Sequence, residues 1–203
     1  LFSATSFMMG TLGPMELAAH GIALQLAGLA FMIPLGLSSA TTIRVGHALG
    51  RGDRTDVTRA ATTALGLGLI IACVSALIFL TMPQALIGLY LDLDAPSSTA
   101  VVPLAVSFLA VAGIFQIVDG VQALSSGALR GLKQARIPML IALVSYWGVG
   151  VPGGYGLAFV AGWGGVGIWW GLAIALAAAA TLMTAYLYVW IARSAATGPD
   201  PET

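Results

Sequence analysis

Long apolar stretches separated by short polar ones dominate this sequence of 203 residues. A helix that crosses a bilayer needs about 20 mostly apolar residues, and most of these stretches reach that length. The pattern predicts helices at about 1–12, 16–49, 57–82, 99–132, 137–160 and 168–192. The sequence therefore predicts an all-α fold, a polytopic bundle of transmembrane helices over residues 1–192.

The first of these stretches, residues 1–12, is too short to cross a bilayer. We therefore expect it to be the end of a helix that begins upstream, and the chain to be a fragment of a longer protein. Two further stretches contain irregularities. Pro34 is expected to kink the second helix, because proline removes a backbone hydrogen bond. The sequence GVPGG at 150–154 is expected to break the fifth.

Composition agrees with a membrane protein. Hydrophobic residues make up 59% of the chain and charged residues only 8%, whereas soluble domains are typically about 25% charged. The single cysteine, Cys73, lies in an apolar stretch. No disulfide framework and no metal cluster is therefore predicted.

The charged residues are distributed unevenly between the predicted ends of the helices. All eight basic residues lie at or after the ends of the second, fourth and sixth stretches: Arg44, Arg51, Arg54, Arg59, Arg130, Lys133, Arg136 and Arg193. The opposite side carries Glu16, Asp92 and Asp94. Because basic loops remain on the cytoplasmic side, we expect these loops and the C-terminus, including a polar tail at 193–203, to be cytoplasmic.

One acidic residue, Asp119, lies inside a long apolar stretch. A charged side chain at the centre of a bilayer costs about 2.5–3.5 kcal/mol even on lenient scales, and such residues usually mark an ion or substrate path. Gln116, Asp119, Gln122, Ser126 and Arg130 follow one another at spacings of three and four, which places them on one helical face. The pattern predicts a helix with a polar stripe, and a cation or proton site at Asp119.

Other side chains are candidates for lining a cavity beside Asp119. Gln25, Gln116 and Gln122 either line it or form hydrogen bonds between helices. Met32 either offers an adaptable surface to ligands or packs in the core. Ser126, which belongs to the same polar stripe as Asp119, and Phe115 are further candidates.

Two long runs resemble a known family. LAAHGIALQLAGLAFMIPLGLSSATTIRVGHALGRGD (17–53) is similar to the segment after the seventh helix of multidrug and toxic compound extrusion (MATE) transporters. SGALRGLKQARIPMLIALVSYWGVGVPGGYGLAF (126–159) resembles the tenth-to-eleventh-helix region of their NorM-like branch. The resemblance implies a twelve-helix transporter made of two six-helix lobes. This chain would be the C-terminal lobe, with its first helix truncated.

The resemblance also implies a function. Family members export cationic and amphipathic compounds and couple this export to entry of Na⁺ or H⁺. Asp119 matches an aspartate of the family's cation site, and Phe115 stands where a tyrosine is often found. Asp119 would ligate Na⁺ through its oxygens or exchange a proton. The expected partners are drug-like small molecules, the bilayer of the bacterial inner membrane and the missing N-terminal lobe. No nucleic acid and no cofactor other than the coupling ion is expected.

Three other functions would make different demands on the sequence. A flippase for lipid-linked substrates should have several cationic residues inside its helices, and none lies there. An intramembrane enzyme is not predicted, because H-E-x-x-H, G-x-S-x-G, P-loop and paired intramembrane carboxylates are absent from the sequence. A non-transporting membrane scaffold would tolerate replacement of Asp119 without loss of activity.

Overall fold

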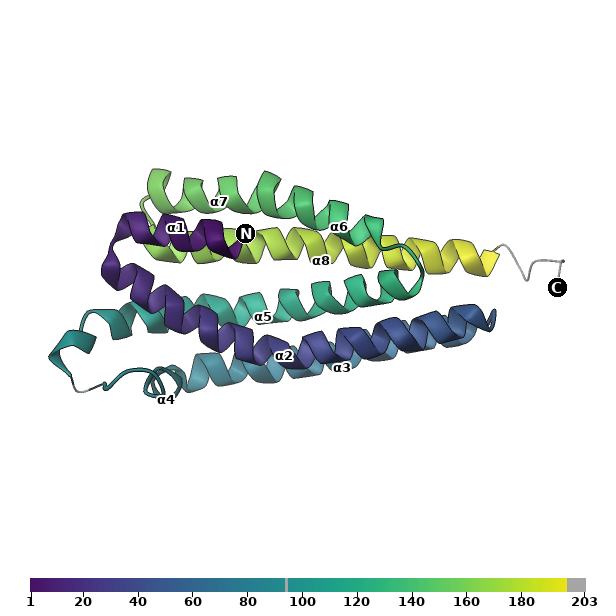
Figure 1. The fold of residues 1–203 in the computed structure, drawn as a ribbon, viewed down its shortest axis with the longest axis horizontal. Coiled ribbons are helices and arrows are strands. Elements are labelled where there is room, and N and C mark those ends of the chain that lie inside the picture. Colours follow the sequence, from purple (N-terminus) through teal and green to yellow (C-terminus); the bar gives the residue numbers. More distant parts are fainter. Residues whose placement is uncertain (94, 197–203) are drawn as a thin grey trace.

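The computed structural model describes residues 1–93 and 95–196 and is built from helices throughout this part (Figure 1). Asp94 and residues 197–203, which make up most of the expected polar tail, lie outside the described residues. The α-helices are α1 (Phe2–Leu12), α2 (Pro14–Gly50), α3 (Arg54–Thr81), α4 (Pro83–Ile87), α5 (Val101–Gly131), α6 (Arg136–Leu143), α7 (Val151–Tyr155) and α8 (Gly164–Ala196), with a 3-10 turn at Pro96–Ser98.

Five helical segments of the described chain are long and apolar enough to cross a membrane. They are Pro14–Gly50, Arg54–Thr81, Val101–Gly131, Arg136–Val160 and Gly164–Arg193. The helix α2 has 37 residues, which corresponds to about 55 Å at 1.5 Å per residue. This exceeds a hydrocarbon core of about 30 Å, so α2 has to tilt or to extend beyond the bilayer.

The sequence around 150–154 does not interrupt the helix. Two π-helical stretches, Val144–Gly150 and Gly156–Val160, flank the short α7 and keep the chain helical from α6 onward. The irregularity is therefore a change of hydrogen-bond pattern, from i→i+4 to i→i+5. Pro152 lies two residues after the first π-helical stretch, and its missing N–H removes one bond from the continuous helical ladder there.

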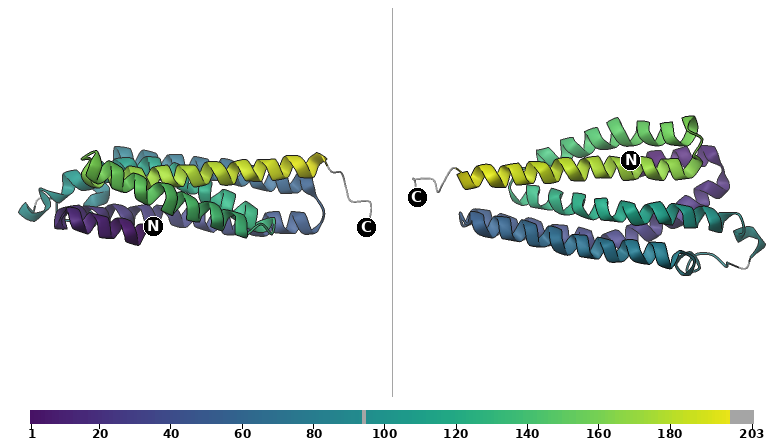
Figure 2. Two further views of the ribbon diagram at one scale, coloured as in Figure 1. Left: turned by 90° about the horizontal axis from the view of Figure 1, so that it is seen from above. Right: turned by 180° about the vertical axis from the view of Figure 1, so that it is seen from behind.

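The central element of the bundle is α5. It packs against α2, α3 and α8, and Figure 2 shows it from behind between α3 and α8. The helix α1 and the α6–α7 segment lie on the side of α8 (Figure 1). The α2–α3 turn, the α5–α6 turn and the C-terminal end of α8 meet at one end of the bundle, at the right in Figure 1. This basic end of the bundle carries the arginines and the lysine.

The α2–α3 turn is short and locally determined. Gly52 has a φ of 71°, a left-handed conformation that glycine adopts without strain. The next residue, Asp53, caps α3, because its carboxylate accepts a hydrogen bond from the backbone N–H of Asp56 at 2.8 Å. The turn thereby fixes α2 and α3 as an antiparallel pair.

The helices α2 and α5 cross at very close range. The space that a Cβ would occupy at Gly127 lies 2.5 Å from Ser38 Oγ, and at Gly131 it lies 2.7 Å from the carbonyl oxygen of Thr42. Two hydroxyls bridge the crossing: Ser38 Oγ donates to the carbonyl of Ala123 at 2.6 Å, and Thr42 Oγ1 donates to that of Gly127 at 2.9 Å. Small residues spaced four apart permit this approach.

Two clusters of buried side chains fill the bundle. One is centred on Trp169, Phe108 and Phe115. The other lies toward the basic end and includes Leu129, Met183 and Leu187. Along α5, Asp119 lies between the residues that belong to these two clusters. The fold therefore places the intramembrane carboxylate at the boundary between two apolar cores.

Candidate functional site

A cavity of about 360 Å³ surrounds the carboxylate of Asp119. Residues of α1, α2, α5, α8 and the π-helical stretch Val144–Gly150 line it: Phe2, Leu24, Ala27, Gly28, Phe31, Phe115, Asp119, Gln122, Tyr146 and Leu176, together with Leu1. Three of these, Asp119, Gln122 and Tyr146, have polar side chains. We call this space the Asp119 cavity.

Asp119 is buried, with 8% of its surface exposed. No side chain or backbone group in the described part of the chain donates a hydrogen bond to it or forms an ion pair with it. Buried polar groups are almost always hydrogen-bonded, and an isolated buried charge is particularly costly. A carboxylate in this position is suited to compensation by a mobile cation or proton.

Tyr146 faces the same cavity from the neighbouring helix. It lies within the π-helical stretch Val144–Gly150 and is close enough to Asp119 for the two side chains to interact electrostatically. Tyr146 was not predicted as a site residue from the sequence. The available signal was a polar aromatic residue within an apolar stretch, and that signal is common at membrane interfaces.

Aromatic rings form one wall of the Asp119 cavity. The ring of Phe115 packs edge-on against Trp169 at 5.8 Å and against Phe2 at 6.4 Å between centroids. Phe31 contributes from α2. Such rings can stabilise an organic cation through their π faces. The cavity therefore combines one carboxylate with an aromatic surface.

Comparison with known proteins identifies the family of this chain. The MatE family model matches residues 1–156. This chain belongs to the MatE family. It is 52% identical over 183 residues to the multidrug resistance protein NorM of Burkholderia vietnamiensis, which covers 90% of this chain and 40% of that protein. It is 47% identical over 184 residues to the probable multidrug resistance protein NorM of Pseudomonas aeruginosa PAO1, and this match covers 91% of this chain and 38% of that protein.

Solved structures confirm the MATE fold. An inward-facing multidrug resistance MATE family transporter superposes with a TM-score of 0.86 at 17% identity, over 97% of this chain and 46% of that one. The eukaryotic MATE transporter AtDTX14 superposes with a TM-score of 0.81 at 22% identity, over 95% of this chain and 44% of that one. The predicted family and fold class are thus confirmed, and this multi-pass membrane chain spans about two fifths of the length of the curated relatives it matches.

Two of the predicted site residues of this MatE chain, Gln116 and Ser126, are buried but do not line the Asp119 cavity. Gln116 donates from Nε2 to the backbone carbonyl of Ala27 at 2.9 Å, and both groups are buried. Gln116 therefore joins α5 to α2, which is the second of the two alternatives for it. Ser126 is also buried, and its hydroxyl accepts a hydrogen bond from Arg130 Nη1 at 2.9 Å.

The face of α2 that lines the Asp119 cavity is offset by one residue from the face predicted from the sequence. Gln25 and Met32 are exposed and do not line the Asp119 cavity. The α2 residues that line it are Leu24, Ala27, Gly28 and Phe31. Successive residues of an α-helix are rotated by about 100°, so Gln25 and Met32 follow Leu24 and Phe31 on an adjacent face. By contrast, Gln122 lines the cavity, and its Nε2 lies 3.8 Å from Met183 Sδ.

Arg130 ends the polar stripe near the basic end of the bundle. Besides its bond to Ser126, its Nη2 donates to Ser38 Oγ at 3.1 Å. Ser38 belongs to α2, so the guanidinium group spans the α2–α5 crossing. The stripe predicted from the sequence therefore has two structurally distinct parts, a cavity around Asp119 and an interhelical hydrogen-bond network around Arg130.

Proposed function

We propose that this chain is the C-terminal lobe of a cation-coupled multidrug antiporter and that Asp119 is the coupling site. The observation that carries the proposal is the buried Asp119 carboxylate, which faces a cavity and has no hydrogen-bond or ion-pair partner within the described residues. Relatives named as multidrug resistance proteins support the substrate class. The remaining lobe would complete the transporter.

The chemistry follows from competition for one negative charge. Na⁺ prefers hard oxygen ligands, and Asp119 together with the Gln122 carbonyl and the Tyr146 hydroxyl can supply them. A proton would neutralise the same carboxylate. An organic cation would bind the carboxylate and the aromatic wall of the cavity. Because ion and drug compete for one charge, entry of the ion favours release of the drug, which is the requirement of antiport.

Electrostatics favours a cationic substrate over an anionic one. Neither Lys nor Arg lines the Asp119 cavity in the described chain. A flippase for lipid-linked phosphates would need cationic side chains there to compensate the phosphate charge. The cavity thus matches the drug antiporter better than this alternative.

We further propose that the basic end of the bundle faces the cytoplasm of a bacterial cell and that the bundle lies in the inner membrane. The turns and the helix end that carry the basic residues share one end of the bundle (Figure 1). Basic loops are retained on the cytoplasmic side during insertion. This orientation would direct export away from the basic end.

The test is drug efflux from cells that express the full-length transporter containing this chain. Wild type is compared with Asp119→Asn, which keeps the shape and removes the charge, while a Na⁺ or H⁺ gradient is imposed in turn. Asp53→Asn is the matched control, because Asp53 is exposed and asparagine caps a helix as well as aspartate does. We expect loss of efflux only in Asp119→Asn at equal membrane levels. Wild-type efflux of Asp119→Asn under both gradients would show that coupling lies elsewhere.

A further inference from the structure

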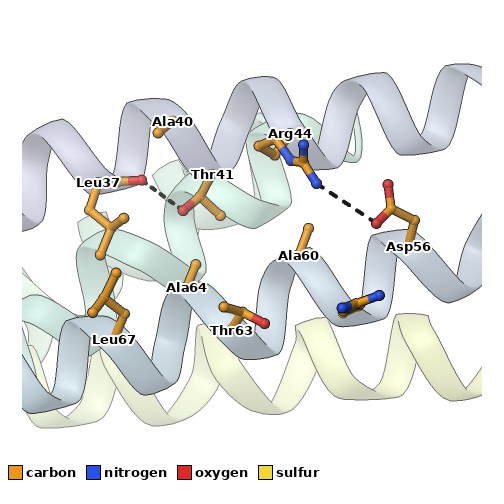
Figure 3. A pocket seen from close by; sticks show the side chains of 10 residues that line it. Leu37, Ala40, Thr41, Arg44, Asp56, Ala60, Thr63, Ala64 and Leu67 are labelled. Carbon is orange, nitrogen blue, oxygen red and sulfur yellow. Dashed lines mark hydrogen bonds and ion pairs between the residues drawn. The ribbon is translucent and has the colours of Figure 1, made fainter.

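A second hollow lies between α2 and α3, on a different pair of helices from the Asp119 cavity (Figure 3). Its volume is about 470 Å³. The lining changes along its length: Arg44, Asp56 and Arg59 form one end, and Leu37, Ala64 and Leu67 form the other. Small side chains lie between these ends. We call it the α2–α3 groove.

The charged end of the α2–α3 groove has an excess of positive charge. Asp56 accepts a hydrogen bond from Arg51 Nη2 at 2.6 Å, so its carboxylate is already engaged. Arg44 lies farther from it, at 3.9 Å, and the side chain of Arg44 is 70% exposed (Figure 3). Arg59 forms no ion pair within the described residues. Arg44 and Arg59 therefore line this end beside one carboxylate that Arg51 already engages.

The groove extends from the charged end to the apolar surface of the bundle. Leu67 follows Arg59 by eight residues along α3, which is about 12 Å at 1.5 Å per residue. Leu67 is 46% exposed, and Ile70, one turn farther on, is 63% exposed. This order, a charged end followed by an exposed apolar surface, matches the order of headgroups and hydrocarbon in a lipid leaflet.

We propose that the α2–α3 groove binds an anionic phospholipid, with its phosphate between Arg44 and Arg59 and an acyl chain along Leu37 and Leu67. Charge complementarity identifies the occupant: guanidinium groups pair well with phosphate oxygens, and basic pockets between transmembrane helices bind anionic headgroups. The apolar wall is matched to an acyl chain rather than to a free phosphate. This proposal does not depend on the role of Asp119.

The experiment uses the full-length transporter containing this chain, purified in nanodiscs. Co-purified lipids and the binding of added phosphatidylglycerol or phosphatidylcholine are measured by native mass spectrometry. We expect selective retention of phosphatidylglycerol. The double variant Arg44→Gln with Arg59→Gln should lose roughly fivefold in affinity for each arginine removed. Arg44→Lys with Arg59→Lys should keep most of the preference.

The matched control is Arg136→Gln. Arg136 is an exposed basic residue at the start of α6 and lies outside the groove. It should leave the lipid preference unchanged. An equally large effect of Arg136→Gln would reveal unspecific attraction to the basic end and overturn the proposal. Two other results would also overturn the proposal. One is equal binding of the two lipids, and the other is photo-cross-linking of the groove to the other lobe instead of to a photoactivatable phosphatidylglycerol.

Discussion

Replacing Gly127 by alanine tests the close crossing of α2 and α5. The new methyl group would lie 2.5 Å from Ser38 Oγ and 2.6 Å from the carbonyl oxygen of Ser38. Part of this obstacle is backbone, so it cannot be relieved by a rotamer change alone. The two helices would have to separate, which would weaken the hydrogen bonds from Ser38 to Ala123 and from Thr42 to Gly127.

The expected cost can be estimated from these contacts. Overpacking at a tight site typically costs about 1–3 kcal/mol. Hydrogen bonds between membrane helices contribute on average about 0.6 kcal/mol each, so weakening two of them costs about 1 kcal/mol. Glycine-to-alanine changes also gain helix propensity, up to about 1 kcal/mol. A control that shares this gain is therefore necessary.

Gly36→Ala on α2 provides that control, because a Cβ at Gly36 meets no atom within 4 Å. The free energy of unfolding is measured for both variants by titration with sodium dodecyl sulfate, followed by tryptophan fluorescence. We expect Gly127→Ala to be less stable than Gly36→Ala by about 1–3 kcal/mol. Equal stability of the two variants would refute the close crossing.

Two further variants examine the surroundings of Asp119. Tyr146→Phe should raise the cation concentration for half-maximal efflux roughly tenfold, because an oxygen proposed to contact the cation is lost and polar contacts to charged groups contribute about 1.5 kcal/mol or more. Tyr155→Phe, in a separate apolar hollow, should not shift it; equal shifts would exclude Tyr146 from the site. Gln116→Leu should lower the free energy of unfolding by about 0.6–1.7 kcal/mol, since it removes the bond to Ala27; unchanged stability in the same detergent titration would contradict this role.

The location of the candidate site was predictable because acidic residues are rare in membrane helices. Asp119 was therefore identifiable from the sequence alone. The periodicity of the stripe was less informative, because it covers a wide arc: Gln116 and Gln122 are six residues apart and thus about 120° apart around α5. One edge of that arc meets α2 through Ala27, and the other lines the cavity.

Contacts between helices could not be predicted from apolar and polar periodicity. Tyr146 is 27 positions from Asp119 in sequence, and nothing in the hydropathy of either helix indicates that they meet. On α2, the spacing of Gln25 and Met32 identified a face but not the neighbour that covers it. The cavity instead uses the adjacent face, where Gly28 has no side chain and leaves space.

The two sides of the Asp119 cavity differ in backbone structure, since α2 and α5 are α-helical and Val144–Gly150 is π-helical. On one side, α2 and α5 are held together toward the basic end, where Gly127 and Gly131 lie against the backbone of α2. Opposite them, Tyr146 belongs to a seven-residue π-helical stretch, a hydrogen-bonding pattern that is rare and occurs mostly as single turns. Conversion of one such turn to the α pattern would rotate the side chains beyond it about the helix axis. We therefore expect the side formed by α2 and α5 to keep its shape and the side that carries Tyr146 to adjust to ligands of different size.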